Sequence, residues 1–279
     1  MLGLIVRVAL ILFATPIIVN EWYMPFLNAS TSHITFDPWS DWIKGGGAPI
    51  AFPYGYTMWL VFIPLTLLLK TIGLPLQYSY VLTLLFSDLA LLLLLYLMLP
   101  GRDRLLLLCY WLSPIVILAS YGLGYNDLVP ILLVVLSLFF MQRQRLTLAG
   151  VTCAAAVSAK LSMVLVLPFF LVYLINNRSL RQRLSKFLVG LLAGGLALWL
   201  PFLFSNSGLH MLFSNPEMGK VYLLALNLGN NIHIYVVPLL YFVMLYMFWR
   251  VGRLNYDLLH VTLGIVFLLI VLMTPASPG

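Results

Sequence analysis

Two aspartates in the first long polar segment have the spacing and surroundings for acid–base chemistry. Asp37 and Asp41 lie in the stretch FDPWSDW, residues 36–42. If Pro38 begins a helix, the four-residue spacing puts both carboxylates on one face, with Asp37 as the N-cap. At the edge of an apolar layer a carboxylate stays ionised yet poorly hydrated, which suits a general base. The same pattern also fits a capped interfacial helix with solvated acids that do no chemistry.

Three further ionisable residues lie within or beside long apolar runs, where a charge is costly and usually has a partner or a function. Asp88 is in the middle of a leucine-rich run, where it either lines a binding site or pairs with another buried polar group. Asp127 follows Tyr125 and Asn126, and either binds a ligand or caps the helix expected from residue 128. Lys160 follows an alanine-rich run. It is either a lysine that reaches the membrane interface or a cation that faces a phosphate.

The composition shows which solvent these residues meet. Of the 279 residues, 63% are hydrophobic and 8% are charged, whereas a soluble domain has about a quarter of its residues charged. A bilayer-spanning helix needs about 20 apolar residues, so the length allows about eight spans and little else. We therefore expect a single transmembrane domain over residues 1–279, an all-α polytopic helix bundle.

The connections between the apolar runs predict how the chain crosses the membrane. Clusters of Lys and Arg mark the cytoplasmic side, and four connections are basic: Arg102 and Arg104; Arg143 and Arg145; Arg178, Arg181, Arg183 and Lys186; Arg250 and Arg253. Arg7 is interpreted in the same way as a mark of a cytoplasmic N-terminus. Membrane topology thus explains the net charge of +7, and no nucleic-acid partner is expected.

The first apolar run leads from the cytoplasmic N-terminus to the outer side, and the first basic connection is cytoplasmic again. The chain must therefore cross the membrane inward once, net, between them. Residues 20–56 carry three acids and one lysine, and are predicted to be an acidic outer loop. Residues 57–76 are interrupted by Pro64 and Pro75, and an interior proline costs a helix about 3 kcal/mol. Residues 78–99 make the better span. Residues 57–76 are therefore predicted to be a re-entrant or interfacial helix pair on the outer side.

The order of these polar elements resembles that of the GT-C superfamily of integral membrane glycosyltransferases, which use polyprenyl-phosphate sugars. Within residues 35–173 the resemblance rests on these motifs in order: DPWSDW (37–42), FPYGY (52–56), SDL (87–89), SP (113–114), GYND (124–127), LAG (148–150), AK (159–160) and LPF (167–169). A similar succession is found in glucosyl- and mannosyltransferases of the endoplasmic reticulum (ER) and in bacterial relatives.

The resemblance implies an inverting transfer of a hexose from a polyprenyl-phosphate donor to a lipid-linked or glycan acceptor on the outer or lumenal face. It implies that Asp37 deprotonates the acceptor hydroxyl, with Asp41 as the second candidate. Whether a divalent metal ion binds at these two acids stays open. The other residues that it implies bind substrate are Tyr54, Asp88, Tyr125, Asn126, Asp127 and Lys160. Donor, acceptor and membrane lipids are the expected partners.

The resemblance also predicts a multi-pass protein of the ER membrane in a eukaryote, or of the plasma membrane in a bacterium. Residues 274–279 are similar to a loop that precedes further helices in relatives, which predicts a C-terminally truncated chain. Two other functions stay open: a non-catalytic GT-C-fold subunit that binds lipid or acts as a scaffold, and a transporter or flippase. The two outer acids argue against the scaffold, and the single interrupted segment argues against the transporter.

Overall fold

The computed structural model describes residues 1–229, 232–252 and 254–274. The chain forms two compact units. The first comprises Met1–Met163 and Phe187–Ser214, and the second comprises Val164–Lys186 and the described residues from Asn215 onward. The expectation of one transmembrane domain stays a prediction. Arg253 and most of the predicted C-terminal loop, residues 275–279, lie outside the described residues.

The described residues are mainly helical, which confirms the all-α membrane class. Three helices are long and apolar enough to cross a membrane: α5 (Gln77–Met98), α12 (Leu184–Leu203) and α15 (Tyr256–Met273). A pair of helices, Asp103–Trp111 and Pro114–Gly122, bent by 45°, makes a fourth if it counts as one span. Shorter apolar helices of 10–17 residues are α1 (Leu2–Phe13), α4 (Tyr56–Thr71), α8 (Leu128–Gln142), α9 (Leu146–Ala159), Leu161–Asn176 and α14 (Val236–Arg250). The count of about eight spans stays a prediction.

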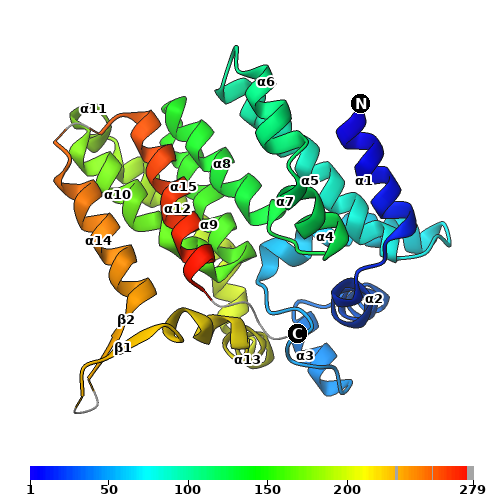
Figure 1. Cartoon of the computed structure of the whole chain (residues 1–279). Coiled ribbons are helices and arrows are strands. Elements are labelled where there is room, and N and C mark those ends of the chain that lie inside the picture. The colour runs from blue at the N-terminus through cyan, green and yellow to red at the C-terminus, as the bar shows by residue number, and fades with distance from the viewer. Residues whose placement is uncertain (230–231, 253, 275–279) are drawn as a thin grey trace. The chain divides into compact units, whose positions relative to one another are not determined.

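In the first unit α5 packs along α8, and α8 along α9 (Figure 1). Small residues let α9 approach α12 at backbone distance. A Cβ on Gly150 would lie 2.1 Å from the Phe187 carbonyl oxygen, and one on Gly190 would lie 2.0 Å from that of Thr147. Close contact through small residues is how helices associate where lipid removes the hydrophobic driving force.

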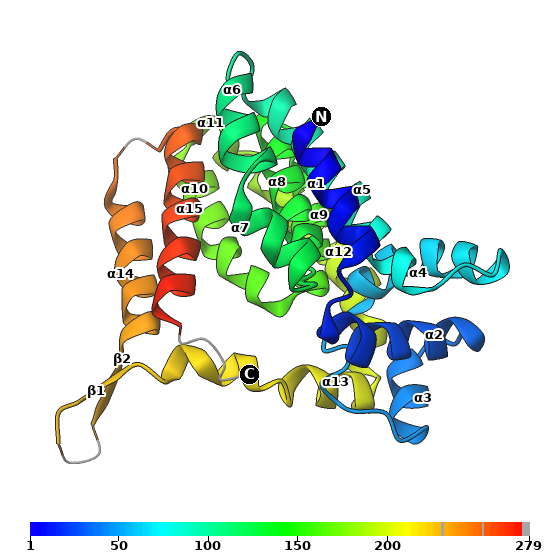
Figure 2. The ribbon, with the colours of Figure 1, turned by 45° about the vertical axis from the view of Figure 1, so that its right-hand side comes forward.

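Residues 56–71 form one uninterrupted helix, α4, with Pro64 inside it. The predicted break at Pro64 is therefore wrong. The buried face of α4, which includes Phe62 and Thr66, belongs to a helix packed on α2, α5 and α9, and this packing outweighs the loss at the proline. The chain turns instead at Gly73, whose φ is +71°. In Figure 2, α4 lies beside α2 and crosswise to α1, but its re-entrant or interfacial position stays a prediction.

The acidic loop of residues 20–56 contains more helix than predicted. A π-helical turn, Val19–Tyr23, leads into α2 (Met24–Ser32), and α3 (Pro38–Lys44) follows. The short helix that begins at Pro38 with Asp37 as N-cap is confirmed. Trp39 is fully buried. Its ring contacts the rings of Tyr56 and Phe202, so this helix contributes to the core of the first unit.

The second unit contains α10 (Leu167–Asn176), α11 (Arg178–Arg181), α14 and α15. It also has a 3-10 helix, Pro216–Tyr222, and the antiparallel strands β1 (Ala225–Asn227) and β2 (His233–Tyr235), paired with Leu226 opposite Ile234. This hairpin was not predicted from the sequence. None of the predicted site residues lies in this unit.

Candidate functional site

Asp37 is oriented by three hydrogen bonds at the start of α3. Its Oδ1 accepts from the backbone N–H of Ser40 (3.1 Å) and from the hydroxyl of Ser205 (2.6 Å), and its Oδ2 accepts from the hydroxyl of Ser40 (2.6 Å). Ser205 is the N-cap of α13 (Asn206–Phe213) and was not predicted from the sequence. A carboxylate has about four acceptor positions, so the half-buried Asp37 can accept one more hydrogen bond.

Asp41, one turn further along α3, is exposed and accepts a hydrogen bond from the Thr35 hydroxyl (2.6 Å). Among the described residues, no group of three or more His, Cys, Asp or Glu side chains is placed to hold a metal ion. The two acids therefore differ in their surroundings. Asp37 is held among hydroxyl donors, whereas Asp41 faces solvent.

Residues 52–56, the FPYGY element, connect the Asp37 loop to the end of α9. The Tyr56 hydroxyl donates to the carbonyl of Phe36, next to Asp37. Burial, and then the charge of Asp37, raise the pKa of Tyr56. On the other side, the backbone N–H of Gly55 donates to the carbonyl of Ser158 (3.1 Å). Ser158 lies two residues before Lys160, so residues 52–56 contact the backbone both next to Asp37 and near Lys160.

Lys160 is the C-cap of α9, and its ammonium group forms an ion pair with Asp127. The two side chains are 32% and 44% exposed. Asp127 occupies the N-cap position of α8, but its side chain makes no capping hydrogen bond. The interpretation of Asp127 as a helix cap is therefore wrong, and its carboxylate is committed to Lys160 instead. Lys160 therefore lies beside the turn of residues 125–127.

Buried tyrosines lie beside this ion pair. The hydroxyls of Tyr54 and Tyr23 share a hydrogen bond of 3.0 Å, and Tyr23 stacks on Tyr80 at 5.3 Å between ring centroids. Burial, followed by Tyr54, raises the pKa of Tyr23 far above its usual value, and the charges of Lys160 and Asp127 also act on it. Tyr54 thus contacts Tyr23, on which both charges of the ion pair act, and its role in substrate binding stays a prediction. Tyr23 and Tyr80 carried no sequence signal that separates them from other aromatic residues of the chain.

The turn before α8 places the last two predicted residues, Tyr125 and Asn126, in different surroundings. Gly124 adopts a φ of +78°, and its carbonyl accepts from the Tyr80 hydroxyl (2.8 Å). Tyr125 is 42% exposed, and Asn126 is 1% exposed. Tyr125 is accordingly accessible to a ligand or lipid, whereas Asn126 is part of the support of the turn.

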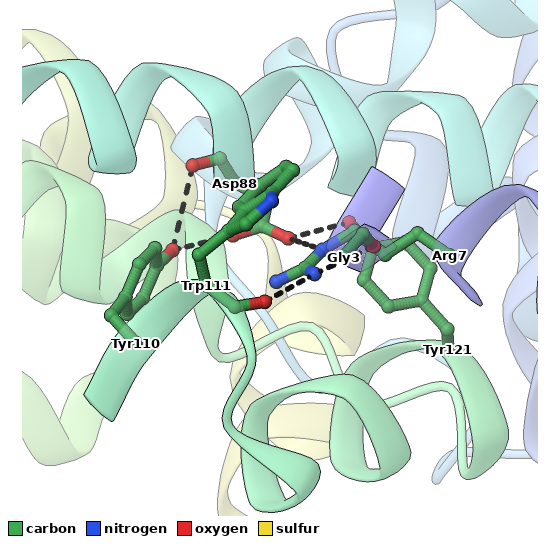
Figure 3. Close-up of polar contacts among 6 residues, drawn as sticks. All are labelled: Gly3, Arg7, Asp88, Tyr110, Trp111 and Tyr121. Carbon is green, nitrogen blue, oxygen red and sulfur yellow. Dashed lines mark hydrogen bonds and ion pairs between the residues drawn. The ribbon is translucent and has the colours of Figure 1, made fainter. Parts of the chain in front are cut away.

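Asp88 belongs to a separate, closed cluster (Figure 3). Its Oδ2 accepts from Arg7 Nε (2.6 Å) and the Tyr121 hydroxyl (2.8 Å), and its Oδ1 accepts from the Tyr110 hydroxyl (2.6 Å). Both charged side chains are fully buried. These contacts agree with the alternative in which Asp88 pairs with a buried polar group. The interpretation of Arg7 as a cytoplasmic marker is wrong, because the side chain lies inside the protein and also contacts the face of Trp111, 3.9 Å from its centroid.

Comparison with known proteins identifies a family for this chain. Residues 40–225 match the family model described as ALG3 protein. This range is about two thirds of the chain, begins just after Asp37, and contains the other predicted site residues: Asp41, Tyr54, Asp88, Tyr125, Asn126, Asp127 and Lys160. No curated protein and no solved structure matches the chain.

Proposed function

The chain belongs to the ALG3 protein family of GT-C-type membrane glycosyltransferases, and we propose that it transfers mannose with inversion, using Asp37 as the general base. The family implies dolichyl-phosphate mannose as donor, a lipid-linked oligosaccharide as acceptor and the ER membrane as location. The scaffold, transporter and bacterial alternatives find no support in this membership.

The observation that carries the proposal is the two-sided contact of residues 52–56. Tyr56 contacts the backbone beside Asp37, and Gly55 contacts the backbone beside Lys160. Displacement of a phosphate from a sugar needs a base for the incoming hydroxyl and a positive charge for the departing phosphate. One short element that contacts the backbone near both groups is suited to keep them in a fixed relation across a sugar.

The proposed step is a single displacement. The acceptor hydroxyl oxygen attacks the anomeric carbon of the donor, and its proton passes to the Asp37 carboxylate. The bond between the anomeric carbon and the phosphate oxygen breaks, and its electron pair leaves with the polyprenyl phosphate. Lys160 stabilises the negative charge that this phosphate gains. Attack opposite to the leaving group inverts the configuration at the anomeric carbon.

The surroundings of Asp37 favour it over Asp41 as the base. Ser40 and Ser205 fix both of its oxygens, which pre-orients the carboxylate at low cost in entropy. The exposed Asp41 has only one contact among the hydrogen bonds described above. A lumenal position of this site is proposed from the basic connections, which place the loop of residues 20–56 opposite the arginine clusters.

The test compares Asp37→Asn, its matched control Asp41→Asn, and Lys160→Met in purified protein. Mannose transfer from a dolichyl-phosphate mannose donor is measured together with the melting temperature. We expect Asp37→Asn to abolish transfer, Asp41→Asn to retain most of it, and Lys160→Met to lower kcat/KM more than tenfold. Loss of transfer in Asp41→Asn, together with full activity in Asp37→Asn, would identify Asp41 as the base instead. Full activity in both would rule out either aspartate as the base.

A further inference from the structure

Asp127 stands at a position where an aspartate normally caps a helix, yet it does not do so. Its backbone is already helical, with φ −62° and ψ −20°, and its side chain makes no bond to the first turn of α8. A capping aspartate contributes about 1 kcal/mol to a helix. The carboxylate instead contacts Lys160 across 33 residues of sequence.

Part of the surface of the ion pair is open to solvent. Both side chains are partly exposed, at 32% for Lys160 and 44% for Asp127, and such a pair contributes little to stability. Tyr23 lies beside it and is neutral, because burial, and then the neighbouring Tyr54, raise the pKa of Tyr23 far above its usual value. The charge that any phosphate at Lys160 meets next is therefore the carboxylate of Asp127.

Donor and product differ in charge at this point. A polyprenyl-phosphate sugar is a phosphodiester with one negative charge, whereas the released polyprenyl phosphate is a monoester. A phosphate monoester has a second pKa of about 6 and carries a charge of about −1.5 to −2 at pH 7. Lys160 alone would therefore bind the product more tightly than the donor, which would slow turnover.

We propose that Asp127 is a specificity-determining residue that offsets this preference and promotes release of the polyprenyl phosphate. This inference rests on the proposed function, in which Lys160 faces the donor phosphate. Repulsion between like charges grows with the charge on the ligand, so Asp127 acts more strongly on the product than on the donor. Between turnovers, Asp127 also keeps the ammonium group of Lys160 at the site.

The experiment measures two constants in wild type, Asp127→Asn, Asp127→Glu and Lys160→Met: the Kd of polyprenyl phosphate and the KM of the donor. We expect Asp127→Asn to lower the product Kd at least threefold and the donor KM by a smaller factor. Asp127→Glu keeps the charge and should resemble wild type. A partly exposed ion pair contributes little to stability, so the melting temperature should be retained.

The outcomes separate the inference from the function on which it rests. Weaker or unchanged binding of polyprenyl phosphate to Asp127→Asn, or equal shifts for donor and product, would overturn the inference. If the inference fails in this way but Lys160→Met binds polyprenyl phosphate more than tenfold more weakly than wild type, the proposed phosphate site is still supported. Wild-type affinity in Lys160→Met would instead contradict the phosphate site itself, whatever Asp127→Asn does.

Discussion

The hydroxyl of Ser205 donates a 2.6 Å hydrogen bond to Oδ1 of Asp37 across 168 residues of sequence. Each residue is the N-cap of its own helix, Asp37 of α3 and Ser205 of α13. The Ser205 oxygen accepts from the backbone N–H of Gly208 at 2.8 Å while it donates to the carboxylate. The bond therefore joins two short helices through the residue that we propose as the base.

Ser205→Ala should impair catalysis more than folding. The substitution removes one of three donors that orient Asp37, and we expect a fall in kcat of about tenfold from the lost alignment. The lost cap on α13 should cost about 1 kcal/mol of stability. Steady-state kinetics and thermal unfolding on the same preparation measure both effects. Ser214→Ala, at the other end of α13, removes only an exposed contact to His210 and serves as the control. Normal kcat in Ser205→Ala would show that Ser40 alone positions the carboxylate.

The Arg7–Asp88 pair predicts a different pattern, in which two changes together cost less than either alone. Both side chains are fully buried, and removal of one partner leaves an uncompensated charge that typically costs about 3–5 kcal/mol. We therefore expect Arg7→Met and Asp88→Leu each to lower the melting temperature strongly. The double variant should recover much of the loss, because replacement of a whole buried pair by apolar residues is often neutral.

Thermal unfolding of the four proteins in one detergent measures this coupling. A double variant as unstable as the sum of the two single variants would mean that the residues do not act as a pair. Tyr121→Phe is a milder probe, because it removes one hydroxyl donor from Asp88 and leaves the ring beside Arg7. It should cost about 1–3 kcal/mol for the hydrogen bond to a charged group.

Local signals in the sequence allowed the prediction of α3 but not of the Arg7–Asp88 pair. An aspartate followed by proline carries its own start signal, so the helix at Pro38 and its cap follow from neighbouring residues. Arg7 and Asp88 are 81 residues apart, and no local pattern specifies their contact. The rule that arginine marks the cytoplasmic side then led to a wrong interpretation of Arg7.

Tertiary packing also explains the other departures in the first unit. Pro64 lies within α4 because buried side chains such as Trp59 and Phe62 bind this helix to its neighbours, and propensity is a weak prior against such packing. Asp127 has the residue type and position of a cap, yet its side chain pairs with Lys160 and makes no capping hydrogen bond.

The four basic connections predict the same topology without Arg7, and this topology can be tested. Cysteines at the exposed Lys44 and Tyr125 should react with an impermeant thiol reagent added from the lumenal side. Cysteines at the exposed Gln142 and Ser179 should not. Asn126 is unsuitable because it is buried.

The labelling background must lack both native cysteines, of which Cys109 is exposed and Cys153 is buried. Each position is labelled in sealed microsomes, which protect lumenal cysteines from the reagent, and in detergent-solubilised membranes, where cysteines of both sides are accessible. Lumenal labelling at Gln142 would contradict the predicted orientation of α8 and, with it, the lumenal position of the proposed site.

Gly55 offers a direct test of the contact that carries the proposed function. A Cβ at this position would lie 2.5 Å from the carbonyl oxygen of Ser158, a backbone atom that cannot rotate away. Gly55 has an ordinary φ of −83°, so an alanine here is opposed by lack of space and not by backbone strain. We expect Gly55→Ala to push residues 52–56 away from the end of α9, and so to change the relation of Asp37 to Lys160.

The expected result is a loss in kcat/KM of more than tenfold, with a loss of stability of about 1–3 kcal/mol, as is typical of overpacking. Kinetics are measured on the monodisperse fraction after size exclusion, so that loss of fold is not counted as loss of activity. Gly195→Ala is the matched control, because no atom lies within 4 Å of its added Cβ. Near-normal kinetics in Gly55→Ala, beside a lowered melting temperature, would show that residues 52–56 stabilise the unit without setting the distance between base and cation.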